Sequence, residues 1–528
     1  MTSIRFSLFA ARDPNAIAIV DADDSEWSRG RVAALSNQVS RTLRRLGLAE
    51  GEVLGIMAPN GAEFMVMYLA ATQIGLRVVA VNWHLAPAEI AYILEDSQAK
   101  ALFAHERFRT SVLDALTMTS WRPPVLLAHG DIPGFLRWED AIAGAEDSAL
   151  ADPVVGRTLF YTSATTGRPK GVKLSIANAS AALDQTIQRR VADGTELENH
   201  VFLCASMLYH GAPLEAAAVA LHMGHTLVVV DRFAPEHLLR LIERYRVTLA
   251  YMIPSTFSRL LRLSEEVRNS YSTASLRRVV HTGAPCPIEV KRQMLEWWGP
   301  VLWEVYAGAE GGGTMVGPKD WLEHPGTVGK ALPGSRLKIL NDDGEELAPG
   351  QIGTIYMTRS NGERFEYSGD SEKTRSAYHG DFFTLGDVGY LDAEGYLFIC
   401  DRKADMIISY GMNIYSAEIE RVLATHPKVK DCAIIGAPHD VAGEIVVAVV
   451  QVENDVEEGR KPTSDILAFL GQHLGVTKLP RRIVYTSEPL RNATGKISKQ
   501  ALRDRYVAAA SRDVRVENNR EDRASPLP

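Results

Sequence analysis

The chain has 528 residues, which is too long for one ordinary hydrophobic core and predicts at least two domains. Its net charge of -8 argues against non-specific binding to nucleic acid, and its longest apolar runs are strand-sized rather than membrane-spanning. Four cysteines lie far apart without CxxC spacing, which argues against a zinc site or a disulfide framework. The N-terminus lacks the features of a secretory signal, so we expect a cytoplasmic location.

From about residue 52 to 305, short β-branched runs alternate with longer segments of helical period. Such alternation predicts parallel strands covered by helices. The clearest examples are strands expected at 53–57, 78–81 and 226–230, and helices expected at 63–74 and 235–245. Between residues 327 and 397, frequent turn pairs and strand-period segments predict an antiparallel sheet or a small barrel.

After residue 405 the pattern changes to a compact α+β block. It predicts a helix from about Ser416, a helix from Ser464 and three strands, at 432–435, 444–452 and 482–485. The predicted fold class is therefore α/β, with a large N-terminal domain that has parallel sheets and a small β-barrel-like subdomain, and a smaller, mobile α+β C-terminal domain. We place these domains at residues 1–401 and 402–510, and a disordered tail at 511–528, where the sequence is charged and poor in large apolar residues.

A run of hydroxyl residues and glycine follows an apolar strand near residue 160. Backbone N–H groups and hydroxyls in such a turn can surround phosphate oxygens, and a lysine adds a positive charge. The lysine lies three residues beyond the glycine and no Ser or Thr follows it, so this is not the ordinary P-loop. Taken alone, such a cluster is more often a polar surface loop than a phosphate site. Its candidate binding residues are Thr162, Ser163, Ala164, Thr165, Thr166, Gly167 and Lys170.

Three further segments follow in order: residues 306–311 (Tyr-Ala-Gly-Ala-Glu-Gly), residues 385–387 together with 401–403, and residues 492–496 (Asn-Ala-Thr-Gly-Lys). With the phosphate loop, they resemble the adenylate-forming superfamily of AMP-forming acyl-CoA synthetases, peptide-synthetase adenylation domains and luciferases. The resemblance covers residues 10 to 506. It implies an acyl-CoA ligase that forms a thioester from a carboxylic acid through an acyl-AMP intermediate, with ATP, Mg²⁺ and coenzyme A.

The resemblance also implies nucleotide-binding roles. The phosphate loop would hold the β- and γ-phosphates, and Glu310 would bind Mg²⁺. Asp387 would accept the ribose hydroxyls, with Arg402 on ribose or phosphate. Structural ion pairing is the alternative for the charged residues. The adenine would lie between a backbone segment and a ring, formed by Gly283, Ala284, Pro285 and Tyr306.

The resemblance also implies that one site runs both reactions because the small domain rotates between the steps, and we place the hinge at Lys403 or Ala404. Lys496 would bridge the carboxylate and the α-phosphate during adenylation, and a solvated lysine is its alternative. Tyr410 and Gly411 would line the pantetheine channel after rotation.

His210 would gate the acyl pocket, unless it is simply a core histidine. Small residues near it would leave room for a long or bulky apolar acid, such as one from secondary metabolism. We also expect a homodimer as the default assembly. The candidate lining residues are Met207, Tyr209, Val305, Ala307, Gly308, Gly312 and Gly313.

The sequence departs from the superfamily pattern at two positions. Ala164 stands where glycine is usual, and Ala309 where threonine is usual and donates to the α-phosphate. A lost hydrogen bond to a charged group costs roughly 1.5–3 kcal/mol. The complete reaction therefore has an alternative, thioester formation alone from an acyl-adenylate that a companion ligase supplies. Loading of a carrier protein, light emission and non-catalytic adenylate binding are further alternatives.

Overall fold

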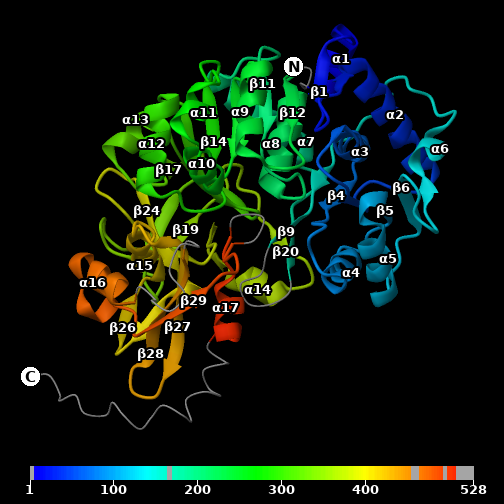
Figure 1. The fold of residues 1–528 in the computed structure, drawn as a ribbon. Helices are drawn as coiled ribbons and strands as arrows, with labels where there is room; N and C mark the ends of the chain where they lie inside the picture. Colours follow the sequence, from blue (N-terminus) through cyan, green and yellow to red (C-terminus); the bar gives the residue numbers. More distant parts are fainter. Residues whose placement is uncertain (1–4, 163–168, 453–462, 492–495, 507–528) are drawn as a thin grey trace, which may run out of the picture. The chain divides into compact units, whose positions relative to one another are not determined.

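The computed structural model describes residues 5–162, 169–452, 463–491 and 496–506. The described chain forms two compact units (Figure 1). Unit 1 holds the described residues up to 336 together with residues 357–383, and unit 2 holds residues 337–356 and the described residues from 384 onward. The domain boundary that we expect after residue 401 marks the point where the C-terminal domain would turn, and it stays a prediction. The tail expected at 511–528 lies outside the described residues.

The larger sheet of unit 1 has nine strands, in the order β17-β16-β15-β14-β13-β11-β12-β1-β2. Its central strands are parallel, and antiparallel strands complete both edges. The parallel strands are β1 (Ile17–Val20), β11 (Val201–Cys204), β12 (Thr226–Val229), β13 (Leu249–Met252), β14 (Arg278–His281) and β15 (Leu302–Gly308). The edge strands are β2 (Glu26–Ser28), β16 (Gly311–Val316) and β17 (Lys330–Ala331).

A second sheet of unit 1 has six strands, all parallel, in the order β7-β6-β5-β3-β4-β8. Every residue of β3 is buried, because helices cover both faces of this sheet. The strands are β3 (Val53–Met57), β4 (Arg77–Ala80), β5 (Ala101–His105), β6 (Val125–His129), β7 (Leu136–Arg137) and β8 (Arg157–Thr158).

Helices cover both sheets of unit 1. One core cluster joins residues of both sheets with α3 (Ala62–Thr72) and α8 (Gly211–His222), so these two helices pack in the interior that the sheets share. The other helices are α1 (Phe6–Arg12), α2 (Arg29–Arg45), α4 (Pro87–Asp96), α5 (Arg109–Met118), α6 (Trp138–Ile142), α7 (Ala179–Ala192), α9 (Pro235–Arg244), α10 (Pro254–Leu261), α11 (Glu265–Asn269), α12 (Ile288–Trp298) and α13 (Pro318–Glu323), with the short turn η1 (Glu106–Phe108).

A small antiparallel sheet completes unit 1, in the order β20-β10-β9. A short helix and a hairpin follow β20 along the chain. These elements are β9 (Phe160–Thr162), β10 (Lys170–Lys173), β20 (Glu366–Tyr367), α14 (Ser371–Ser376), β21 (Tyr378–His379) and β22 (Phe382–Phe383).

Unit 2 begins with antiparallel strands and continues into an α+β block. The first group is β18 (Leu337–Leu340), β19 (Gly353–Met357, all but its last residue), β23 (Asp387–Leu391) and β24 (Leu397–Arg402). The strands of the block are β25 (Ile407–Ser409), β26 (Met412–Ile414), β27 (Val429–His439), β28 (Gly443–Val452) and β29 (Arg482–Thr486). Its helices are α15 (Ser416–Leu423), α16 (Thr463–His473) and α17 (Lys499–Tyr506), with the short turns η2 (Lys403–Asp405) and η3 (Val476–Lys478).

The α/β fold class is confirmed, as are the strands and helices expected from the alternating pattern. Their observed ends lie within about two residues of the expected ones, a normal uncertainty for helix ends. In the part of the chain that the structure describes, no helix combines the length and the apolar character needed to cross a membrane.

A buried ion pair ties α12 to the nine-stranded sheet. Lys291 Nζ lies 2.7 Å from Glu304 Oε2, and their side chains are 0% and 8% exposed. Burial lowers the pKa of Lys291 and raises that of Glu304, so each group depends on the other for its charge.

Replacing one partner of this pair leaves the other charge buried. We expect Lys291→Met to lower the free energy of unfolding by roughly 3–5 kcal/mol in urea denaturation. The double variant Lys291→Met with Glu304→Leu should recover most of that loss, because it removes both charges. Equal losses in the single and double variants would contradict this account.

Candidate active site

The predicted phosphate loop connects the antiparallel strands β9 and β10. Thr162 pairs with Lys170 in the backbone register, so the ends of the loop lie side by side. Lys170 donates to the carboxylate of Asp370, which also accepts the backbone N–H of Lys373 at 2.9 Å. The bond from Lys170 holds the pKa of Asp370 below its usual value. Burial lowers the pKa of Lys373, and the nearby charge of Lys170 lowers it further. The ammonium group of Lys170 thus pairs with Asp370, and the ammonium group of Lys373 interacts electrostatically with Asp370 and Glu310.

Most predicted residues of this loop lie outside the described part of the chain. These are Ser163, Ala164, Thr165, Thr166 and Gly167, and only the backbone of Thr162 is described. Their phosphate-binding role stays a prediction.

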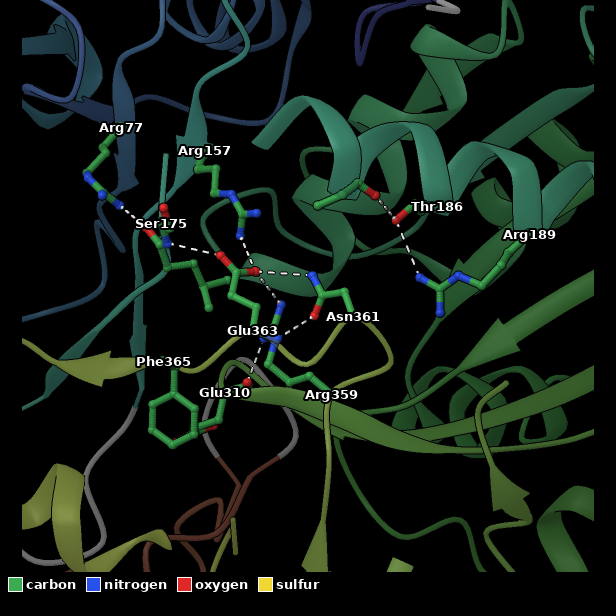
Figure 2. Close-up of polar contacts among 12 residues, drawn as sticks. Arg77, Arg157, Ser175, Thr186, Arg189, Glu310, Arg359, Asn361, Glu363 and Phe365 are labelled. Atoms are coloured by element: carbon green, nitrogen blue, oxygen red, sulfur yellow. Dashed lines mark hydrogen bonds and ion pairs between the residues drawn. The ribbon is translucent and has the colours of Figure 1, made fainter. Parts of the chain in front are cut away.

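Glu310 occupies the turn between β15 and β16 and is buried. Its Oε1 accepts the hydroxyl of Tyr367 at 2.8 Å. Its backbone carbonyl accepts Arg359 Nη1 at 2.6 Å (Figure 2). Burial, and then the carboxylate of Glu310, raise the pKa of Tyr367, so the phenol stays neutral and donates. Sequence reasoning missed Tyr367 and Arg359, because neither lies in a recognised motif.

The donor set at Glu310 fits a magnesium ion that is held mainly by a nucleotide. Among the described residues, no group of three or more His, Cys, Asp or Glu side chains could hold a metal. Magnesium commonly binds one protein carboxylate together with substrate phosphates and water. Tyr367 would then orient the ligating carboxylate, as hydrogen-bonding partners of metal ligands generally do.

Removing this orienting bond should weaken magnesium binding. We expect Tyr367→Phe to raise the Mg²⁺ concentration for half-maximal activity by roughly tenfold. Tyr271→Phe is the matched control, because its hydroxyl also donates to a glutamate, Glu236, at 2.9 Å but on the protein surface. An unchanged Mg²⁺ dependence of Tyr367→Phe would contradict the orienting role.

The predicted adenine and acyl residues lie at one edge of the nine-stranded sheet. Strands β14 and β15 are parallel, and His281 of β14 is paired with Glu304 of β15. Gly283 and Tyr306 each lie two residues beyond this pair, so both lie near the carboxyl ends of the strands. Gly283 has a φ of +87°, which favours glycine, and Ala284 and Pro285 continue this turn. His210 follows β11 in the same sheet and precedes α8. Ligands of open α/β sheets bind at this carboxyl-end edge.

The loop before α8 is held by Asn60, a residue that sequence reasoning missed. Asn60 Nδ2 donates to the carbonyls of Ser206 at 3.0 Å and Val230 at 2.8 Å, and its Oδ1 accepts the backbone N–H of Leu208 at 2.8 Å. The only local signal is the turn sequence Pro-Asn-Gly after an apolar strand.

The aromatic acyl-site candidates are in contact with each other. Tyr209 is buried, and its ring meets His210 edge-on at 4.5 Å between centroids. Met207 is half-buried in the same loop, and its carbonyl accepts the backbone N–H of His210 at 3.1 Å.

The glycines of β16 are required by the packing of the protein itself. A Cβ on Gly312 would lie 2.7 Å from Met357 Sδ, and a Cβ on Gly313 would lie 2.2 Å from the carbonyl oxygen of Tyr306. A side chain at either position would therefore clash with the protein itself, and whether these two glycines border an acyl group stays a prediction. On β15, Val305 and Gly308 are half-buried and Ala307 is exposed, and their contact with an acyl group stays a prediction.

In unit 2, the predicted ribose residues are neighbours. Asp387 and Arg402 pair across β23 and β24, with Arg402 Nε 3.4 Å from Asp387 Oδ1. Asp387 is buried, whereas the side chain of Arg402 is 48% exposed. The arginine can therefore move toward a ligand while the carboxylate stays fixed.

Neutralising this carboxylate should weaken nucleotide binding. We expect Asp387→Asn to weaken AMP binding by roughly ten- to hundredfold in calorimetric titration, because charge-assisted hydrogen bonds are worth roughly 1.5–3 kcal/mol. The control is Asp381→Asn, an exposed carboxylate of unit 1. Equal effects of the two variants would show that Asp387 only pairs with Arg402.

The C-terminal candidates lie in two separate segments of unit 2. Lys496 is exposed and sits beside the bridge between Arg491 and Ile497, and Arg491 binds Asp431 through two bonds of 2.9 and 3.0 Å. Tyr410 and Gly411 form the two-residue turn between β25 and β26, with φ values of +50° and +74°. Their roles toward the reacting groups and coenzyme A stay predictions.

An enzyme that joins a carboxylate to a nucleotide must bring two anions together, and cations and hydrogen-bond donors are the groups that can offset that repulsion. The class that this fold and these groups define is the adenylate-forming enzymes. The profile described as AMP-binding enzyme matches residues 6–362, and that of the AMP-binding enzyme C-terminal domain matches residues 418–496. The chain therefore belongs to the family of AMP-binding enzymes.

Its relatives are named acid–thiol ligases. The chain is 31% identical to the long-chain-fatty-acid–CoA ligase FadD13 of Mycobacterium tuberculosis, over 92% of this chain and 94% of that protein. It is 30% identical to the 2-succinylbenzoate–CoA ligase of Bacillus pumilus, over 93% and 96%. The structure of ATP-bound MatB from Rhodopseudomonas palustris matches with a TM-score of 0.81 at 28% identity, over 96% of this chain and 99% of that chain.

Proposed function

We propose that this enzyme forms an acyl-CoA thioester from a carboxylic acid, ATP and coenzyme A in two steps, through an acyl-AMP intermediate. The observation that carries the proposal is the oriented carboxylate of Glu310, which accepts from Tyr367 beside a turn held by Arg359. An enzyme that only received finished acyl-adenylate would have little use for a magnesium ligand, because magnesium serves the departing pyrophosphate. Relatives named as ligases of fatty, succinylbenzoic and indoleacetic acids support an acid substrate.

In the first step, Lys170 and the phosphate loop hold the β- and γ-phosphates and Tyr306 stacks on adenine. Glu310 would hold a magnesium ion, which would supply positive charge to the phosphates. The carboxylate attacks the α-phosphate beside Lys496, and pyrophosphate leaves. In the second step, the thiol of coenzyme A, guided by Tyr410 and Gly411, attacks the acyl carbonyl and AMP leaves. His210 borders the acyl group in both steps.

The alternative is thioester formation alone, and Ala309 is the observation that favours it. This residue lies in the turn beside Glu310, and its methyl group has no donor for the α-phosphate. A companion ligase would then supply the acyl-adenylate. Loading of a carrier protein is a third possibility, since one relative is named fatty acid–[acyl-carrier-protein] ligase ScoC of Streptomyces coeruleorubidus.

The complete reaction is tested by supplying acids in two forms, as free acid with ATP and as synthetic acyl-AMP, each with coenzyme A. We expect thioester from both forms and pyrophosphate release from the first. Thioester from acyl-AMP alone would instead establish the half-reaction.

The two steps should separate in a Lys496 variant. We expect Lys496→Ala to lose thioester formation from free acid by at least about hundredfold, because the bridging charge is needed only when carboxylate and phosphate meet. Thioester formation from acyl-AMP should fall by much less. Lys319→Ala, an exposed lysine of unit 1, is the control. Equal losses in both assays would contradict the assignment of Lys496 to the first step.

A further inference from the structure

One face of α8 borders a recess in the interior of unit 1. Leu214, Ala217 and Leu221 pack into the core, whereas Ala212 and Glu215 are exposed. Residues three apart share a helix face, so Ala212 and Glu215 present one accessible surface.

The surroundings of Glu215 show that this surface is internal. Three groups interact electrostatically with its carboxylate: Tyr68 on α3, Arg157 on β8 and Arg359 after β19. Tyr68 is 6% exposed, and the side chains of Arg157 and Arg359 are 9% and 14% exposed. A carboxylate exposed among such interior groups lines a recess rather than the outer surface.

Glu215 has no hydrogen bond or ion pair with any residue that the structure describes. Burial raises the pKa of its carboxyl group to about 7, although Arg359 and Arg157 act in the opposite direction. The group is therefore poised to hold a proton at neutral pH, and a protonated carboxyl is a hydrogen-bond donor.

The arginines of the recess have donor atoms that the protein does not use (Figure 2). Arg157 Nη1 lies 3.2 Å from Glu363 Oε2, and Arg359 Nη2 lies 3.6 Å from the same atom. Within the described residues, Arg157 Nε and Nη2 and Arg359 Nε are buried without a hydrogen-bond partner. Buried donors left in this way cost free energy unless a ligand supplies the acceptor.

The charges of this cluster do not balance. Arg77 pairs with Arg157 in the strand register. Burial lowers the pKa of Arg77, and the neighbouring charge of Arg157 lowers it further. Three guanidinium groups therefore lie near the carboxylate of Glu363. Two of them, Arg157 and Arg359, also lie near Glu215, which is partly neutral. An interior with surplus positive charge and unused donors is a site for an anion.

We propose that this recess receives a second carboxylate at the far end of the acid substrate, so that the substrate class is the dicarboxylic acids. Arg157 and Arg359 donate to that carboxylate through their unused N–H groups, and protonated Glu215 donates a third hydrogen bond. The inference rests on the proposed function, in which His210 borders the reacting end of the acid. Glu215 lies about 7.5 Å along the axis of α8 from His210, at about 1.5 Å per residue, which a chain of several carbons can span.

The test uses the full-length enzyme and a series of α,ω-dicarboxylic acids from succinic to dodecanedioic acid. Each is compared with the monocarboxylic acid and the ω-hydroxy acid of equal carbon number. Thioester formation with ATP and coenzyme A gives kcat/KM, and calorimetry of the AMP-bound enzyme gives binding of the same acids without turnover. We expect at least one diacid to exceed its matched monoacid by about tenfold or more in both measurements.

Two variants locate the effect. Arg157→Leu should abolish the diacid preference and leave the KM for ATP unchanged, with Arg122→Leu, an exposed arginine, as the control.

In the wild type, the diacid preference should fall as the pH rises from about 6 to about 8, because Glu215 loses its proton and repels the carboxylate. Over this range Arg157 and Arg359 stay charged and Tyr68 stays neutral. Glu215→Gln keeps a donor, so its preference should not depend on pH, whereas Glu296→Gln, an exposed control, should behave as the wild type.

The outcomes separate the inference from the proposed function. Thioester from monoacids without a diacid preference overturns the inference and leaves the function intact. If no acid gives thioester, the function fails and calorimetry still decides the inference. A raised KM for ATP in Arg157→Leu with an unchanged acid preference would assign the anion to the nucleotide phosphates and overturn the inference. A preference for the ω-hydroxy acid over the diacid would overturn it as well.

Discussion

Several charged groups of this enzyme are buried, and a charge in such a place is stable only beside a partner. Lys291 and Glu304 form a buried pair that ties α12 to the nine-stranded sheet. At the candidate site the compensation is incomplete. Lys170 donates to Asp370 near a second lysine, Lys373, and Arg402, beside Asp387, is half-exposed. Partial compensation is what a site for anionic substrates requires, because the ligand completes it.

The sequence predicted well what depends on local pattern. Strands β3 and β28 were predictable from their unbroken apolar runs, because a strand buried on both faces is apolar at consecutive positions. Helix α9 was predictable because a helix buried on one face repeats its apolar residues with helical period. The turn at Gly283 and the acidic turn at Glu310 were predictable because glycine marks them. The strands before them, β14 and β15, are parallel neighbours in the structure.

The sequence did not predict partners that lie far along the chain. Asn60 binds the loop before α8 across about 150 residues, and Tyr367 reaches Glu310 across 57. Nothing local marks such residues, because their role is set by the packing of separate elements. The packing role of the β16 glycines is a further example. A Cβ on Gly312 would meet Met357 and Phe383, which are distant in sequence, so the sequence alone does not show why glycine is needed there.

One contact in unit 2 connects the strand before the expected hinge with the helix after it. Asp401, in β24, accepts the hydroxyl of Ser416 at 2.6 Å and the backbone N–H of Ala417 at 3.2 Å, at the start of α15. Lys499 donates to the same hydroxyl at 2.5 Å. If the chain turns at Lys403 or Ala404, this contact has to open, since it spans the hinge. It would then act as a latch, and its strength would set how long the enzyme stays in one orientation before the second reaction begins.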